Sequence, residues 1–210
     1  MNRAAIAGGI VFALIGGGVS ASAQSASPTD ENWDVRASLA TYVFTSEDNY
    51  VQPTITADHG RLHLESRYNY EEHRSLSALV GWNFDYGETV KLDLTPMIGG
   101  VFGRIDGVIP ALAADLSWKR LEAYSESEVV IDVHDASSSF FYSWSEFSIW
   151  PTERFRAGGV VQRTRVYQTP REVQRGLLAG AVMSKLEGTV YLFNPGSDDQ
   201  FLVFSIGVRF

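Results

Sequence analysis

A short polar segment near the middle of the chain carries the residue types of an acyl-transfer site. His134 and Asp135 are followed directly by Ala136 and then by three serines, Ser137 to Ser139. A hydroxyl nucleophile needs a base within hydrogen-bond reach and a third group that orients the base. Neighbouring residues on one turn rarely achieve this geometry, and polar turns commonly collect these residue types. Hydrolysis or acyl transfer at this group is therefore kept as an alternative hypothesis.

Other histidines and the absence of cysteine bear on metal chemistry. His73 follows Glu71 and Glu72, and His59 and His63 are four residues apart in a chain that contains no cysteine. The pair His59 and His63 falls on a turn and on an extended run, so its spacing does not match a zinc site. We expect no metal and no other cofactor.

A second set of charged residues recurs along runs of alternating polarity and could line a water-filled interior. The set contains Asp34, Arg36, Glu65, Arg67, Lys91, Asp93, Asp115, Glu122, Glu126 and Glu187. Both signs are present and acids dominate, so the lining would show a mild preference for cations. The same charges could instead form cross-strand pairs that stiffen the wall.

The elements that must position these residues are β-strands. From Trp33 to Phe210 apolar and polar residues alternate over runs of about ten, a pattern typical of strands with two different faces. Eleven turn clusters interrupt the runs, at residues 46–49, 58–60, 71–74, 86–88, 104–107, 119–120, 134–136, 151–153, 169–171, 184–185 and 195–198. Eleven turns predict twelve strands, although the ambiguous faces of residues 140–150 and 155–167 leave a count of ten open. In the two ambiguous runs we expect Glu146 and Arg163 to point inward.

Strands of this length fit a tilted span of a bilayer. The prediction is an all-β fold, a transmembrane antiparallel up-and-down β-barrel over residues 33–210 with short turns on both sides. A β-sandwich has shorter strands, and a lipocalin-type barrel points its apolar face inward. Pro53, Pro96 and Pro110 fall within strands, and we expect bulges near residues 96–100 and at 110.

Aromatic residues favour the membrane barrel because they gather near the expected strand ends in two groups, as interfacial belts do. One group contains Phe44, Tyr50, Tyr68, Tyr70, Phe102, Phe140, Phe141, Tyr167, Phe193 and Phe201. The other contains Trp33, Trp82, Phe84, Tyr86, Trp118, Trp150, Phe155 and Phe210.

The first 23 residues have the layout of a secretory signal. Arg3 precedes an apolar stretch, and Ala21, Ser22 and Ala23 form a small-residue cleavage site. We expect cleavage before Gln24, followed by a flexible lead-in over residues 24–32. Removing residues 1–23 takes away Arg3 and leaves 16 basic against 25 acidic residues, a net charge of −9. Such a balance argues against nucleic acid as a partner.

The final strand carries apolar residues on one face, Phe204, Ile206, Val208 and Phe210, and the sequence ends on that last aromatic residue. In this stretch, Phe201 to Phe210, the chain resembles the C-terminal signal of bacterial outer-membrane β-barrel proteins. The resemblance implies recognition by the barrel-assembly machinery and a location in the outer membrane of a Gram-negative-type bacterium.

Twelve strands lie between eight, which side chains fill, and sixteen, which leave an aqueous channel. The expected function is therefore a narrow passive, porin-like channel or a structural membrane barrel, and not an enzyme. The alternative is a lipid-modifying hydrolase or acyltransferase that uses the surface His, Ser and Asp group. Connections of about two to six residues offer no surface for large ligands, so the expected partners are membrane lipid and small solutes, and the expected state is a monomer.

Overall fold

The computed structural model describes residues 32–45, 48–167 and 172–210. The predicted signal peptide, almost all of the lead-in, and turn residues 46–47 and 169–171 lie outside this part of the chain. The described residues form thirteen β-strands and one turn of 3-10 helix, η1 (Ala136–Ser138). The strands are β1 (Asp34–Phe44), β2 (Tyr50–His59), β3 (Leu62–Tyr68), β4 (Leu76–Trp82), β5 (Phe84–Tyr86), β6 (Val90–Phe102), β7 (Gly107–Trp118), β8 (Leu121–Asp132), β9 (Phe140–Ile149), β10 (Phe155–Val166), β11 (Glu172–Met183), β12 (Leu186–Phe193) and β13 (Phe201–Arg209).

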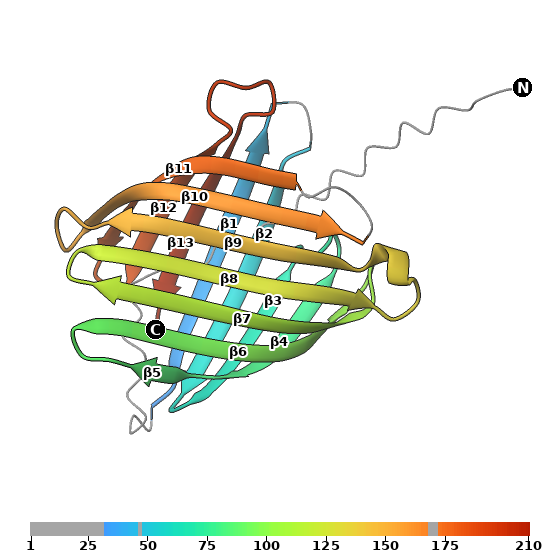
Figure 1. The fold of residues 1–210 in the computed structure, drawn as a ribbon, viewed down its shortest axis with the longest axis horizontal. Coiled ribbons are helices and arrows are strands. Elements are labelled where there is room, and N and C mark those ends of the chain that lie inside the picture. Colours follow the sequence, from blue (N-terminus) through green and yellow to red (C-terminus); the bar gives the residue numbers. More distant parts are fainter. Residues whose placement is uncertain (1–31, 46–47, 168–171) are drawn as a thin grey trace, which may run out of the picture.

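The strands form one closed antiparallel barrel (Figure 1). Sequential strands pair with each other except β4 and β5, which both pair with β6, and β1 also pairs with β13. The short strand β5 continues β4 after Asn83, because Gly81 of β4 and Phe84 of β5 pair with Met97 and Leu94 of the same strand β6. β4 and β5 together occupy one strand position, so the barrel wall has twelve strand positions, which confirms the predicted barrel and its strand number.

The prolines are accommodated without the expected bulges, so that prediction was wrong. The β6–β7 register runs unbroken through Pro96↔Leu112 and Ile98↔Pro110. A proline cannot donate to the ladder, and pairing is interrupted beside these positions instead. The β4–β6 ladder stops after Gly81↔Met97, one position before Pro96, and the β7–β8 ladder skips Ile109 and Pro110 while its register stays the same.

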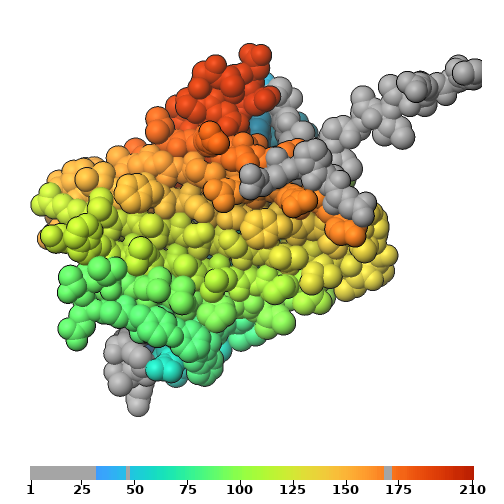
Figure 2. All heavy atoms as spheres, viewed as in Figure 1, coloured from blue at the N-terminus to red at the C-terminus, as the bar shows by residue number. Residues whose placement is uncertain are grey.

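The outer surface of the barrel is apolar. Each of the thirteen strands presents at least one large exposed hydrophobic side chain, for example Leu39 on β1, Phe147 on β9 and Ile206 on β13. Figure 2 shows one side of this surface, formed by β5 to β11 as a continuous wall. Exposed apolar area on this scale requires an apolar environment. No helix in the described ranges is long and apolar enough to cross a membrane.

The start of β1 and the end of β13 lie at one end of the barrel, which we call the terminal end. The Phe210 amide donates a hydrogen bond of 2.9 Å to the carbonyl of Val35. Connections at the terminal end span 2 to 5 residues, whereas those at the opposite end, the loop end, span 4 to 7 residues. The longest loops are thus one residue longer than the sequence predicted.

Candidate functional site

The barrel interior contains a buried ionic cluster centred on Arg67 of β3. Its guanidinium donates from Nε to Glu65 at 2.7 Å and from Nη1 to Glu128 at 2.9 Å, and its Nη2 donates to Glu126. The Arg67 side chain is fully buried, and these three glutamates are nearly so. Glu126 and Glu128 lie on β8, which is four strand positions from β3 around the wall. The hydrogen bonds from Arg67 to these glutamates therefore cross the lumen rather than following its surface. We call these four residues the Arg67 cluster.

The loop between β3 and β4, residues 69–75, folds into the lumen beside this cluster. Tyr70 and Glu71 are both buried, although neither belongs to a strand. The Tyr70 hydroxyl donates to Glu126 at 2.9 Å, and its ring lies 4.0 Å from the Arg67 guanidinium. Burial raises the pKa of Glu71, whose carboxylate lies 3.9 Å from Arg67. A connection that the sequence indicated as a simple turn therefore contributes a lumenal obstruction.

A second buried ion pair joins β9 and β10. Arg156 of β10 donates to Glu146 of β9 at 2.7 Å and to the Thr189 hydroxyl of β12 at 3.1 Å. Glu146 also accepts from the Trp144 indole and from the Tyr191 hydroxyl, each at 2.8 Å. Hydrogen bonds thus satisfy this buried carboxylate, as a charge removed from water requires.

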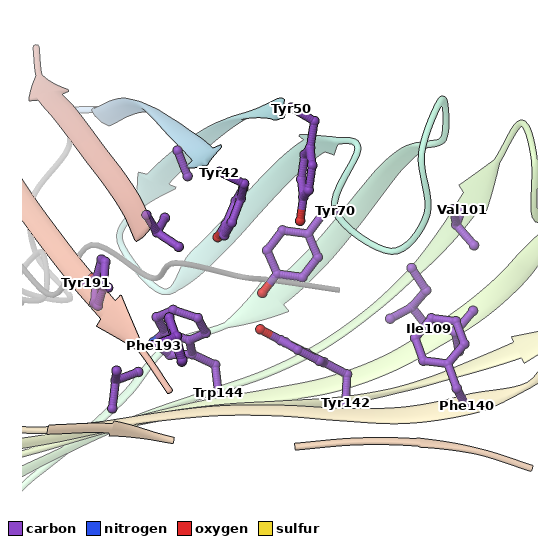
Figure 3. Packing of buried hydrophobic residues seen from close by; sticks show 14 of the residues in the cluster. Tyr42, Tyr50, Tyr70, Val101, Ile109, Phe140, Tyr142, Trp144, Tyr191 and Phe193 are labelled. Carbon is purple, nitrogen blue, oxygen red and sulfur yellow. The ribbon is translucent and has the colours of Figure 1, made fainter. Parts of the chain in front are cut away.

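Aromatic side chains fill the loop half of the lumen. Figure 3 shows Tyr42 of β1 and Tyr50 of β2 facing Tyr142 and Trp144 of β9, with Tyr70 between them. Tyr42 and Tyr50 stack at 4.6 Å between ring centroids, and Tyr70 meets Tyr142 edge-on at 6.1 Å. The cluster continues through stacked pairs that join Phe193, Phe201 and Phe44.

This packing corrects the predicted aromatic belts. Half-buried Phe44 and buried Tyr50, Tyr70, Phe140, Phe193 and Phe201 belong to or pack against the buried cluster instead of facing lipid. At the terminal end, Trp150 lines an interior cavity, and Phe84 is half-buried. The belts that remain on the outer surface consist of Tyr68, Phe102, Phe141 and Tyr167 at the loop end, and of Trp33, Trp82, Tyr86, Trp118, Phe155 and Phe210 at the terminal end.

The terminal half of the lumen contains a cavity of about 370 Å³, which we call the vestibule. Its lining runs from the turn residues Glu153 and Lys185 at the terminal end inward to Tyr70 and Glu126. Eight carboxylate residues line it, against three Arg or Lys residues and His63. His63 itself is held between Asp58, at 2.8 Å from Nδ1, and Glu65, at 3.4 Å from Nε2.

The charged residues singled out in the sequence lie at several depths along the interior. Glu65, Arg67 and Glu126 form much of the Arg67 cluster, and Asp93, Asp115 and Glu187 line the vestibule. Asp34 pairs with Arg36 at 3.0 Å and with Arg209 at 2.7 Å, close to the chain ends. Glu122 is buried and accepts from the Trp150 indole at 2.7 Å. Lys91 is exposed and lines a second hollow at the rim.

Several interior residues escaped the sequence analysis. Glu128 and Arg156 are missing from the predicted set. Glu128 shares the inward face of β8 with the predicted Glu126, and Arg156 shares the inward face of β10 with buried Val160. Glu146, expected inward, is buried in the lumen, whereas Arg163 is exposed on the outer side of β10. Strict two-residue alternation along β8 and β10 would have identified Glu128 and Arg156.

The geometry at His134 does not favour the hydrolase alternative. The Ser137 and Ser138 hydroxyls donate to Asp135 at 2.7 and 3.2 Å, and the Ser137 hydroxyl lowers the pKa of that carboxyl. The exposed His134 ring instead points to Asp106 of the neighbouring loop, 4.0 Å away. Asp135 therefore caps η1, as acidic residues commonly do at a helix start. Within the ranges that the structure describes, no group of three or more His, Asp or Glu side chains could hold a metal ion.

The barrel resembles solved porin structures in its fold. The "KdgM porin" superimposes with a TM-score of 0.61 at 8% identity, over 83% of this chain and 98% of that one. A second structure, "KdgM porin in complex with disordered oligogalacturonate", gives 0.59 at 7% identity over 84% and 98%. The NanC porin gives 0.56 at 10% identity over 85% and 99%. No family model and no curated protein matches the sequence.

Proposed function

We propose that this chain is a monomeric outer-membrane channel of porin type that passes small solutes through a narrow lumen. The observation that carries the proposal is the acid-lined vestibule, which leads from the terminal end to Tyr70 and the Arg67 cluster. A barrel that served only as a rigid support would need no such cavity. The resemblance of the fold to porins supports the same function by analogy.

An outer-membrane location is supported by the apolar exterior and by the exposed aromatic residues near both ends of the strands. In bacterial barrels the shorter turns face the periplasm. The terminal end would then be periplasmic, and the loops that include residues 69–75 would face outward. Residues 1–23 would serve as the export signal, and the face of β13 with Phe204 and Ile206 would be read during assembly.

The charge of the vestibule bears on the solute. A neighbour's title names oligogalacturonate, an oligomer of a sugar acid. Eight carboxylate residues against three Arg or Lys residues and His63 would repel such a polyanion from the vestibule of this chain. We expect cations to be preferred over anions, because rings of acidic side chains favour cations.

A planar-bilayer recording of the native protein, purified in detergent, tests the channel. We expect steady ohmic steps, a reversal potential that indicates cation preference, and a larger conductance for Tyr70→Ala, because the variant removes the side chain that narrows the inner end of the vestibule. The matched control is Tyr68→Ala, since Tyr68 lies two residues away, is 41% exposed and faces outward. A silent bilayer for folded wild type and Tyr70→Ala would refute the channel and leave a structural barrel.

A further inference from the structure

Three aspartates lie side by side across adjacent strands of the vestibule wall. Asp85 of β5 pairs directly with Asp93 of β6, which pairs directly with Asp115 of β7. All three line the vestibule. Directly opposed like charges destabilise a sheet, and this barrel places two such pairs in one row. The arrangement indicates a role other than stability, and we call it the aspartate row.

Asp115 is the most enclosed member of the row. It is 8% exposed, yet its carboxylate has no hydrogen-bond or salt-bridge partner among the described residues. Two other buried carboxylates of this lumen have several partners, because Glu146 accepts three hydrogen bonds and Glu126 is bound by Arg67, Tyr70 and Tyr124. A buried charge without a partner is costly, so a cation that enters the vestibule would supply what Asp115 lacks.

The spacing of the row argues against a single metal ion. Neighbouring strands lie about 4.8 Å apart, so the row extends over about 10 Å from β5 to β7. Metal ions need several oxygen atoms within about 2.6 Å, and no three acidic or histidine side chains in the described part of the protein meet such a requirement. A linear cation with ammonium groups along a chain can instead reach several carboxylates at once.

The rest of the lining suits an aliphatic chain between those ammonium groups. Met97 and Ala113 contribute apolar surface to the vestibule beside the aspartates. Met97 lies four residues after Asp93 on β6, and Ala113 lies two residues before Asp115 on β7, so both share the inward face of the aspartates. We infer that the aspartate row binds a linear aliphatic polyamine, with Asp115 paired to one of its ammonium groups. This inference rests on the proposed function insofar as the polyamine is the solute that the channel admits.

Isothermal titration calorimetry with spermidine on the native protein in non-ionic detergent tests the site. We expect saturable binding that Asp115→Asn weakens about tenfold, in line with the loss of one hydrogen bond to a charged group. Asp93→Asn should weaken it similarly and provides an independent variant should Asp115→Asn not fold. The control Asp198→Asn removes an equal charge from the exposed loop 194–200 and should leave binding unchanged. Magnesium chloride serves as the metal probe.

The outcomes separate the two proposals. Absence of spermidine binding, an equal loss in all three variants, or Asp115-dependent binding of magnesium that spermidine does not displace would each overturn the polyamine site. A protein that binds spermidine as expected but stays silent in a bilayer would refute the channel and leave the binding site. A conducting channel without spermidine binding would refute the site and leave the channel.

Discussion

Replacing Arg67 by methionine tests whether the ionic cluster is truly excluded from water. Arg67 lies fully buried against Glu65, Glu126 and Glu128, so Arg67→Met would leave Glu126 and Glu128 buried without their counter-charge, while Glu65 would keep His63. Removal of one partner from a buried ion pair costs about 3 to 5 kcal/mol. Against a total folding stability of about 5 to 15 kcal/mol, such a loss is large. We therefore expect Arg67→Met to lower the free energy of unfolding by about 4 kcal/mol.

The measurement is equilibrium urea unfolding in lipid vesicles, followed by the fluorescence of the five tryptophans. Arg209→Met is a matched control, because Arg209 also binds a carboxylate at 2.7 Å, that of Asp34, but its side chain is 43% exposed. Exposed pairs contribute about 0 to 1 kcal/mol, so the control should stay within that range. Adding Glu126→Gln and Glu128→Gln to Arg67→Met should recover part of the loss. Equal, small losses for both methionine variants would refute a dry cluster and indicate water around Arg67.

Three further predictions concern packing, pH and assembly. Gly158→Ala should lower the free energy of unfolding in urea by about 1 to 3 kcal/mol, because the added Cβ would lie 2.0 Å from the Phe147 carbonyl oxygen. The control Gly159→Ala should have no measurable effect, because its Cβ would lie 3.7 Å from the nearest atom. Burial raises the pKa of Glu71 in the folded protein, so folding favours its protonated form. This contribution to stability is lost as pH rises from the ordinary glutamate pKa of about 4.3 through the raised pKa. In unfolding titrations at several pH values, Glu71→Gln should flatten that decline in stability, and an unchanged slope would contradict the burial of Glu71. Phe210 is 68% exposed, so Phe210→Ala should leave the stability of refolded protein intact but reduce the heat-modifiable, inserted fraction in cells; equal insertion would argue against a role in assembly.

The barrel architecture was predictable because alternation and turns are local signals. All the predicted turn clusters coincide with, or border, connections between strands, apart from the turn positions that lie outside the described residues. Each strand has two faces fixed by its period of two. The inward charges on β3, β7 and β8 could therefore be predicted from the sequence, because in each strand a charged face lies opposite an apolar face that must contact lipid.

The β9 strand was ambiguous for a physical reason. Its inward face contains Tyr142 and Trp144, while its outward face contains Ser143 and Ser145, the reverse of the usual polarity. The outward serines bond to serines of β8, at 3.1 Å from Ser143 and 3.0 Å from Ser145, which satisfies hydroxyls that would otherwise face lipid. Only the contacts with a neighbouring strand show that such a face can point outward. For the same reason, the inward fold of loop 69–75 could not be derived from its polar composition.

The division of the lumen follows from what can fill a twelve-stranded barrel. Side chains fill an eight-stranded interior, but a wider one needs large residues or leaves water. Here aromatic rings fill the loop half, and charged groups surround the vestibule in the terminal half. The boundary between the halves lies where Tyr70 meets Arg67 and Tyr142. Because Tyr70 belongs to a loop and not to the hydrogen-bonded wall, its displacement would widen the passage without breaking a strand pair. Loop 69–75 is accordingly the part of the structure where a solute could gain passage while the barrel stays closed.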